Sequence, residues 1–253
     1  MPWNPNQYHK FQAERSAPFE DLLKLVEPRS NITAADLGCG TGELTLHLAD
    51  LIPDSQVTGI DLSPQMLEKA QKLERPGLRF LSGDQSDLGG NWDLIFSNAA
   101  LQWSEDHPTL ISNLFNLLNP GGQIVVQVPS NHKHISQRLI AETAQEEPFR
   151  TYLNSYVRIS PVLPIDDYAT LFYHLGAENI IVFEKIYGHV LENAAAVLEW
   201  VSGTVLVPYF ERLGVHKDSF LAVLRKKFEK NMPGNPVFYP FRRTFFSARK
   251  RSR

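Results

Sequence analysis

The feature that most constrains the fold is a run with three glycines, Asp36-Leu37-Gly38-Cys39-Gly40-Thr41-Gly42. The run follows an apolar segment at residues 32–37 and precedes an amphipathic segment at residues 44–51, so we expect a tight turn between a strand and a helix. Because glycine has no side chain, such a turn can bend sharply and bring the backbone close to a ligand. The run therefore predicts a ligand-binding turn, and a purely structural turn is the alternative.

Apolar segments alternate with helical patterns through the first half of the chain, which is typical of a parallel sheet in an α/β fold. The predicted strands are residues 32–37, 56–60, 78–81, 92–96 and 123–128, and the predicted helices between them are residues 44–51, 66–73 and 108–118. Ser63 is expected to cap the second helix, with Pro64 at its first position. Asn119-Pro120-Gly121-Gly122 ends the third helix and turns the chain into the fifth strand.

The second half of the chain predicts two further strands and several helices. Residues 130–158 are polar and helical, 165–175 form a helix, 180–185 a strand that rejoins the sheet, 190–232 further helices, and 241–248 a final strand. The predicted fold is thus a Rossmann-like α/β fold, with a seven-stranded, mostly parallel sheet, helices on both faces and a helical cap. We expect one domain over residues 1–253, with an N-terminal helical segment at 1–25 and a cap insertion at about 190–235.

The charge of the chain argues against general nucleic-acid binding. Its 253 residues carry a formal net charge of -3, with an isoelectric point near 6.2, whereas non-specific nucleic-acid affinity comes largely from clustered Lys and Arg. The basic residues near the end, from Arg242 to Arg253, are read as a solvated chain end. We expect no nucleic-acid partner.

Three observations indicate a cytoplasmic protein with no membrane partner. The single cysteine, Cys39, has no second cysteine with which to form an internal disulfide. The first residues, Met1-Pro2-Trp3-Asn4, lack the charged and apolar regions of a secretion signal. No apolar run approaches the roughly 20 residues that cross a bilayer.

The acid at the start of the glycine run, Asp36, indicates which ligand the turn binds. A glycine-rich turn of this kind could bind NAD, and Gly42 formally supplies the required spacing. Asp36, however, places negative charge where a pyrophosphate would lie, and this charge suits a cationic ligand instead. S-adenosylmethionine carries both an ammonium and a sulfonium group, so it is the expected cofactor.

Polar residues at the ends of the next three predicted strands extend this site. Asp61 lies about 20 residues after the turn, where an acid accepts hydrogen bonds from ribose hydroxyls. Asp84 and Gln85 follow the third strand and suit the adenine ring, while Asn98 follows the fourth. Trp103 suits a wall of the cofactor site, a wall of the substrate site or simple packing. Asp61 as a surface carboxylate and Asp84 as a turn residue are the alternatives.

Taken together, these residues resemble the class I S-adenosylmethionine-dependent methyltransferases, with residues 36–42 as the first motif and Leu118-Asn119-Pro120-Gly121-Gly122 as a later one. Over nearly the whole chain the sequence also resembles the narrower family of trans-aconitate methyltransferases. The residues that carry this likeness include Trp3-Asn4-Pro5, Tyr8, Glu14-Arg15-Ser16, Leu101-Gln102-Trp103, Val126-Gln127, Trp200-Val201 and Arg243. The chain departs from that family at Thr41 and Glu43 and over residues 131–158.

The resemblance implies a site with two sets of residues. The expected cofactor-binding residues are Asp36, Gly38, Cys39, Gly40, Gly42, Asp61, Leu62, Asp84, Gln85, Asn98 and Ala99. The expected substrate-binding residues are Tyr8, Arg15, Trp103, Trp200, Tyr209 and Arg243. For Arg15, the alternative is an ion pair on a helix surface with Glu14 or Asp21. For the aromatic residues, the alternative is the hydrophobic core.

The implied reaction is the esterification of a small polycarboxylic acid by S-adenosylmethionine. A carboxylate with a pKa near 4 is already ionised at neutral pH. The reaction therefore requires no catalytic base, and no catalytic residue is expected. The eight histidines form no spaced ligand set, so no metal site is expected either.

Other functions remain open at this stage. The acceptor could be a malonyl group on a carrier or another metabolite. The chain could also be a non-catalytic module that binds the cofactor and acts through a partner, because a fold does not fix a function. A nucleic-acid methyltransferase ranks lower because of the acidic balance. The sequence leaves the oligomeric state undetermined.

Overall fold

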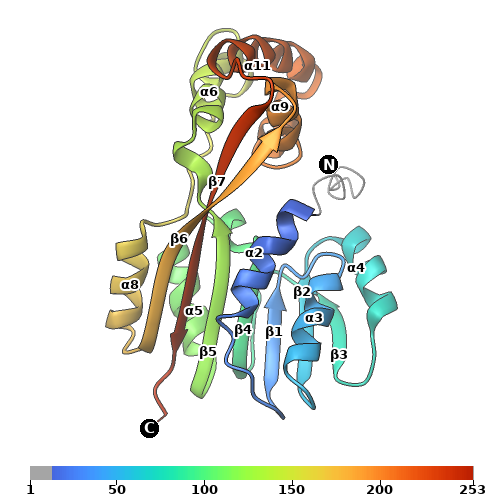
Figure 1. Cartoon of the computed structure of the whole chain (residues 1–253), viewed down its shortest axis with the longest axis vertical. Helices are drawn as coiled ribbons and strands as arrows, with labels where there is room; N and C mark the ends of the chain where they lie inside the picture. Colours follow the sequence, from blue (N-terminus) through green and yellow to red (C-terminus); the bar gives the residue numbers. More distant parts are fainter. Residues whose placement is uncertain (1–12, 253) are drawn as a thin grey trace. The chain divides into compact units, whose positions relative to one another are not determined.

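The computed structural model describes residues 13–252, which form two compact units (Figure 1). The first, here called the sheet unit, comprises residues 13–129, 161–185 and 243–252. The second, called the helical unit, comprises residues 130–160 and 186–242. Each unit has its own hydrophobic core, because no buried apolar cluster of one includes residues of the other.

One seven-stranded sheet runs through the structure in the order β3-β2-β1-β4-β5-β7-β6. Its strands are β1 Thr33–Leu37, β2 Gln56–Asp61, β3 Leu78–Ser82, β4 Trp92–Asn98, β5 Leu118–Pro129, β6 Glu178–Leu191 and β7 Val237–Arg249. The pairs that join β3, β2, β1, β4 and β5 are all parallel, and β7 is antiparallel to β5. The predicted seven-stranded, mostly parallel sheet is confirmed.

Helices cover both faces of the sheet unit. They are α2 Ala13–Leu23, α3 Glu43–Leu51, α4 Pro64–Ala70, α5 His107–Asn116 and α8 Ile165–His174. Phe19 of α2 packs edge-on against Phe96 of β4, with ring centroids 5.9 Å apart. Tyr168 of α8 stacks on Phe246 of β7 at 4.5 Å. Across β5, Phe246 lines up with Ser97, the residue after Phe96, so α2 and α8 pack on opposite faces.

Two helices of the sheet unit begin directly after side chains that cap their first turn. The Ser63 hydroxyl accepts a hydrogen bond from the Met66 amide at 3.4 Å, and Pro64 occupies the first turn of α4, as predicted. Asp106 caps α5 in the same way, since its carboxylate accepts from the Thr109 amide at 3.1 Å. Helix α4 ends at Ala70 and continues as the 3-10 turn η1, Gln71–Leu73.

The helical unit consists mainly of five helices around an aromatic core. They are α6 Ile135–Ala144, α7 Phe149–Tyr152, α9 Ala194–Ser202, α10 Val207–Leu213 and α11 Lys217–Asn231. Residues 130–158 contribute to this unit as well as the predicted cap segment at 190–235. That this unit acts as a cap stays a prediction. Within residues 13–252, no helix has the length and apolar character needed to cross a membrane.

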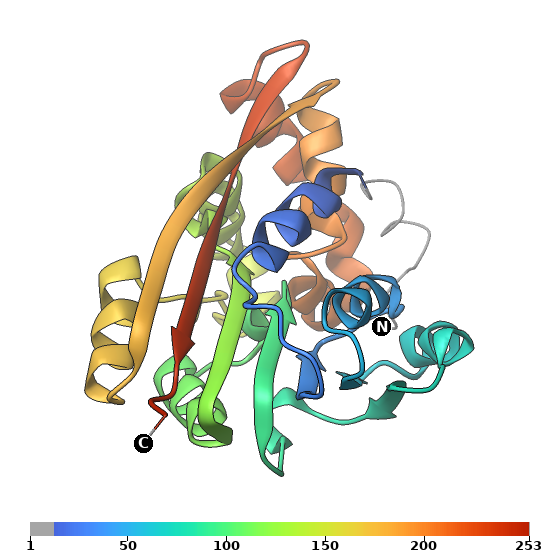
Figure 2. The same ribbon diagram turned by 60° about the horizontal axis from the view of Figure 1, so that its bottom comes forward.

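Strands β6 and β7 are longer than their predicted segments at 180–185 and 241–248. Figure 2 shows them as long neighbouring ribbons, and each has residues in both units. Along β7, Val237, Tyr239 and Phe241 are buried and alternate with less buried positions, so this strand contributes one face to the core of the helical unit. The sequence Val237-Phe238-Tyr239-Pro240-Phe241 itself shows no alternation of apolar and polar residues, so it did not reveal the start of the strand.

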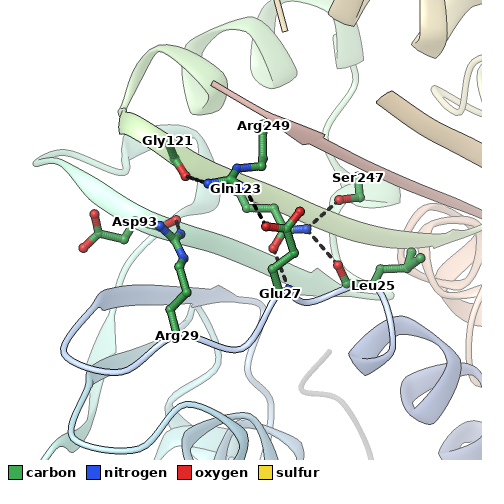
Figure 3. Close-up of polar contacts among 8 residues, drawn as sticks. All are labelled: Leu25, Glu27, Arg29, Asp93, Gly121, Gln123, Ser247 and Arg249. Atoms are coloured by element: carbon green, nitrogen blue, oxygen red, sulfur yellow. Dashed lines mark hydrogen bonds and ion pairs between the residues drawn. The ribbon is translucent and has the colours of Figure 1, made fainter. Parts of the chain in front are cut away.

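Polar contacts at the amino-terminal edge of the sheet fix the segment between α2 and β1 (Figure 3). The side-chain amide of Gln123 donates to the Leu25 carbonyl at 2.7 Å and to the Ser247 hydroxyl at 2.9 Å. Its oxygen accepts from the Glu27 amide at 3.0 Å. Arg249 forms an ion pair with the Glu27 carboxylate at 2.7 Å. These contacts join the segment to both β5 and β7.

Asp93 secures the start of β1 beside the same edge. Its Oδ2 accepts from both the amide and the hydroxyl of Thr33 at 2.9 Å, and its Oδ1 accepts from the Asn119 amide group at 2.9 Å. Burial alone would raise the pKa of this carboxyl, but the hydrogen bonds from Thr33 and Asn119 outweigh it and hold the pKa below its ordinary value. The bonds therefore stabilise the fold above the ordinary pKa, and this stability is lost as the pH falls through the lowered value.

We predict that Asp93→Ala lowers the free energy of unfolding by about 2 to 3 kcal/mol at pH 7, because it removes three hydrogen bonds to a charged group. Urea unfolding of the wild type and the variant measures the difference. Replacing the exposed Asp87 by alanine is the control and should change little. Equal losses in the two variants would show that the Asp93 contacts do not stabilise this edge.

Candidate functional site

The glycine run forms the predicted turn between β1 and α3. The amides of Gly38 and Cys39 donate to the Ile60 carbonyl of β2 at 2.8 and 3.1 Å. Gly38, Gly40 and Gly42 all have a positive φ, which glycine adopts without strain. A Cβ on Gly38 would lie 2.1 Å from the Ala100 Cβ, whereas a Cβ on Gly40 would meet nothing within 4 Å. Gly40 therefore presents bare backbone to open space, where a ligand can approach closely.

Asp61 holds this turn from the end of β2. Its Oδ2 accepts from the Gly40 amide at 2.9 Å, and its Oδ1 accepts from the Ser63 amide at 2.8 Å. The carboxylate therefore links the glycine turn to the start of α4. Each oxygen keeps a second lone pair, so the predicted bonds to ribose hydroxyls stay possible.

Asp36, in β1 just before the glycine turn, is a second acid of this site. Its side chain is buried, and its Oδ2 accepts from the Thr45 hydroxyl of α3 at 2.6 Å. Burial raises the pKa of Asp36 to about 7, the bond from Thr45 opposes this shift, and the nearby Asp61 charge adds to it. A cation bound at the turn would favour the ionised form. Asp61, together with Asp36 in its ionised form, would give the turn a negative potential that suits a cationic ligand.

Cys39 is part of the turn, and its surroundings disfavour a reactive thiolate. Its side chain is buried, and burial together with the charges of Asp36 and Asp61 raises the pKa of the thiol far above neutrality. Since the thiolate is the reactive form, the sulfur stays inert. The residue packs the turn.

The residues after β3 follow the strand that neighbours β2, whose end carries Asp61. Asp84 caps the short 3-10 turn η2, Gln85–Asp87, by accepting from the Ser86 amide at 2.8 Å. The Gln85 amide donates to the Ser104 hydroxyl at 2.6 Å, which joins η2 to the segment after η3, Leu101–Trp103. Leu62, beside Asp61, is an apolar side chain that is 62% exposed, and its contact with the cofactor stays a prediction.

The end of β4 carries a strained residue and an unsatisfied polar atom. Ala99 has a φ of 55°, in the left-handed region that alanine rarely adopts, and its amide donates to the Gln127 carbonyl at 2.9 Å. Such strain concentrates at functional sites. The Asn98 Oδ1 atom is buried and has no hydrogen-bond partner in the described part of the chain. Because buried polar atoms are nearly always paired, this oxygen fits a ligand that donates a hydrogen bond.

The expected substrate residues are distributed over both units. Trp103 and Arg243 belong to the sheet unit, and one Arg243 terminal nitrogen donates to the Gln127 Oε1 at 3.1 Å.

Trp200 and Tyr209 belong to the core of the helical unit. Trp200 packs against Tyr239 and Phe241, and the Tyr209 hydroxyl accepts from the Arg158 amide at 2.9 Å. Their contact with a substrate stays a prediction. Tyr8 lies outside the described residues, and the Arg15 side chain is likewise not described.

The expected site set omitted Thr45, Ser63, Ser104 and Gln127, which the structure places in contact with site residues. Thr45, Ser63 and Ser104 gave no distinctive signal, because hydroxyl residues are common at helix starts and turns. Gln127 did give one. It is the only polar side chain between Ile124 and Val128, and a glutamine inside a buried apolar strand needs a reason.

We predict that the contribution of Asp36 to the thermal stability of the unliganded protein becomes less favourable as the pH rises from about 4.5 to 7.5. The raised pKa of Asp36 means that its neutral form stabilises the fold at low pH, and this contribution is lost as the pH rises towards about 7. Asp36→Asn keeps an acceptor for Thr45 but does not titrate. The difference in Tm between variant and wild type should therefore grow in favour of the variant across this range. A constant difference would mean that the Asp36 pKa is not raised.

Comparisons with known proteins identify the family of the chain. A family model described as a methyltransferase domain matches residues 28–171, more than half of the chain. A trans-aconitate 2-methyltransferase of Deinococcus radiodurans is 47% identical, over 98% of each chain. The enzyme of that name from Paracidovorax citrulli is 35% identical, again over 98% of each chain.

Solved structures show the same fold at low sequence identity. The YcgJ protein of Bacillus subtilis superimposes with a TM-score of 0.63 at 13% identity, over 93% of this chain and 99% of that one. A phosphoethanolamine N-methyltransferase of Haemonchus contortus, in complex with S-adenosylmethionine, gives 0.54 at 18% identity, over 93% of this chain and 52% of that one. At these identities the likeness supports the Rossmann-like fold alone. The family model and the full-length relatives go further, and together they show that the chain belongs to the methyltransferase family and, within it, to the trans-aconitate 2-methyltransferases.

Proposed function

We propose that the protein transfers a methyl group from S-adenosylmethionine to a carboxylate of trans-aconitate. The observation that carries this proposal is the 47% identity to the Deinococcus radiodurans trans-aconitate 2-methyltransferase over nearly the full length of both chains. A match of this extent includes the residues of both units. We propose that the protein is located in the cytoplasm. The free, buried thiol of Cys39 is compatible with that reducing compartment.

The chemistry makes limited demands on the protein. S-adenosylmethionine supplies a methyl group on a positively charged sulfur: a carboxylate oxygen bonds to the methyl carbon while the S–CH3 bond breaks, and its electron pair stays on sulfur as S-adenosylhomocysteine forms. The carboxylate is already ionised at neutral pH, so no side chain must remove a proton. The task of the protein is to hold two reactants in line, which can contribute roughly 7 to 11 kcal/mol in favourable cases.

Residues at the carboxyl ends of β1, β2 and β4 fit the methyl donor. The bare backbone at Gly40 leaves room for it, and Asp36 and Asp61 supply negative charge near its ammonium and sulfonium groups. We assign binding of the ribose hydroxyls to Asp61. We also assign to the Asn98 Oδ1, which has no partner among the described residues, a hydrogen bond that S-adenosylmethionine donates. Gly38, Cys39 and Gly42 shape the turn, and Ala99 fixes the adjoining backbone. Leu62, Asp84 and Gln85 would border the adenine.

The acceptor requires donors and positive charge. Arg15 and Arg243 are the proposed partners for its carboxylates, because a guanidinium can bind a carboxylate through two hydrogen bonds. Trp103, which is 37% exposed, would form a wall beside it. Tyr8, Trp200 and Tyr209 complete the proposed substrate set on the strength of the family resemblance.

We predict that Gly40→Val abolishes measurable binding of S-adenosylhomocysteine in calorimetry, because valine fills the open space and strains a position with positive φ. Asp61→Ala should weaken binding roughly 10- to 100-fold through the loss of hydrogen bonds to a charged group. The control is Glu68→Ala, which removes an exposed acid of α4. If both site variants bind as tightly as the control, the donor lies elsewhere.

The proposed reaction is tested by incubating the protein with methyl-labelled S-adenosylmethionine and a panel of acids. Label should appear in trans-aconitate as a base-labile methyl ester. The trimethyl ester of the same acid, which has no free carboxylate, should accept none. Transfer only to a carrier-linked malonyl group would replace the proposed acceptor. Tight donor binding without transfer to any acceptor would indicate a non-catalytic module.

A further inference from the structure

We propose that Gln127 is a specificity-determining residue, whose side-chain N–H group binds a carboxylate oxygen of the methyl acceptor. Arg243 would hold the Gln127 amide in place and add positive charge. This inference rests on the proposed function and names a residue that the family resemblance did not assign to the site. All residues that carry it belong to the sheet unit.

Two glutamines in β5 provide an internal comparison. Gln123 and Gln127 are four residues apart, so they point to the same face of the sheet, and both are buried. Gln123 satisfies both its nitrogen and its oxygen, through Leu25, Ser247 and Glu27. Gln127 is fully buried, yet its Nε2 has no hydrogen-bond partner within residues 13–252. A buried amide group with neither of its protons in a hydrogen bond is rare, and a ligand that accepts one of them would satisfy it.

Arg243 determines which way the Gln127 amide points. Its guanidinium donates to the Gln127 Oε1 at 3.1 Å, and a flipped amide would place two donors against each other. The Nε2 group is therefore directed away from this contact. Arg243 is itself 5% exposed, so its charge acts in surroundings where electrostatic interactions are strong.

The strand register places these groups in one row. Asn98 of β4 lies directly beside Gln127, and Arg243 of β7 lies opposite Pro129, two residues further along the same face. Asp36 is beside Phe96, two residues before Asn98, and so it also shares this face. The row lies towards the carboxyl ends of the parallel strands, where open α/β sheets bind their ligands.

The charge and hydrogen-bonding character of the side chains changes along this row, so that one end suits the cationic methyl donor and the other suits an anionic acceptor. At β1 and β2 the site offers the carboxylates of Asp36 and Asp61, which suit the cationic donor. At β4 it offers the Asn98 Oδ1, a hydrogen-bond acceptor to which none of residues 13–252 donates. At β5 and β7 it offers the Gln127 N–H group and the Arg243 guanidinium, which suit an anion. An anionic acceptor therefore fits the Gln127 end of the row.

The test compares Gln127→Met with Gln123→Met in the full-length protein. Methionine has nearly the same length as glutamine but donates no such hydrogen bond. We expect Gln127→Met to raise the KM for trans-aconitate about 10- to 100-fold. The Kd of S-adenosylhomocysteine should stay within about twofold, and Tm should fall modestly, because the buried Arg243 guanidinium loses its bond to the Gln127 Oε1. Gln123→Met should lower Tm and leave the KM unchanged.

Gln127→Glu is a second variant of the same shape, which keeps the inference testable if Gln127→Met does not fold. Its carboxylate would pair with Arg243 and repel an anionic acceptor, so the KM should rise at least as much as in Gln127→Met. An unchanged KM in the folded variants would overturn the inference. A parallel loss of S-adenosylhomocysteine affinity would also overturn it, by assigning Gln127 to the donor. A wild type that binds S-adenosylhomocysteine but methylates no acid would instead defeat the proposed function, and the inference with it.

Discussion

The carboxylate of Asp61 is the contact on which the arrangement of the donor site depends. It joins the Gly40 amide of the first turn to the Ser63 amide at the start of α4, and thereby fixes the two nearest loops to the end of β2. The backbone bonds from Gly38 and Cys39 to Ile60 support the same turn from the strand itself. A loop held at both sides loses little freedom when a ligand binds, which is the condition for tight and oriented binding.

A second constraint is the sorting of charge along the carboxyl edge of the sheet. Asp36 and Asp61 lie at the ends of β1 and β2, and β4 ends in Asn98, whose Oδ1 accepts no hydrogen bond from the described residues. Arg243 lies buried on β7. For a reaction between a cation and an anion, such an order would orient both reactants without a catalytic base. It also accounts for the burial of polar groups that would otherwise cost stability.

The sequence was informative wherever a local pattern determined a local structure. The Ser63 cap with Pro64, the three positive-φ glycines and the five parallel strands could all be read directly, because each depends on a few neighbouring residues. The extents of β6 and β7 could not. Their extended ends belong to the helical unit, where Val237 and Tyr239 of β7 contribute to its separate core. This contribution depends on packing between segments that are distant in the sequence. The same limit applied to Trp200 and Tyr209, whose burial in that core no local pattern distinguishes from a ligand contact.

The sequence by itself determined the fold class, the glycine turn and the acids at the strand ends, because strand and helix periods and glycine conformations are properties of short segments. The tertiary structure alone decided which polar atoms are satisfied. Gln123 and Gln127 have the same side chain in the same strand, yet one is fully bonded and the other is not. That difference arises because hydrogen-bond partners such as Leu25, Ser247 and Arg243 come from parts of the chain about 100 residues away, which only folding brings to the strand.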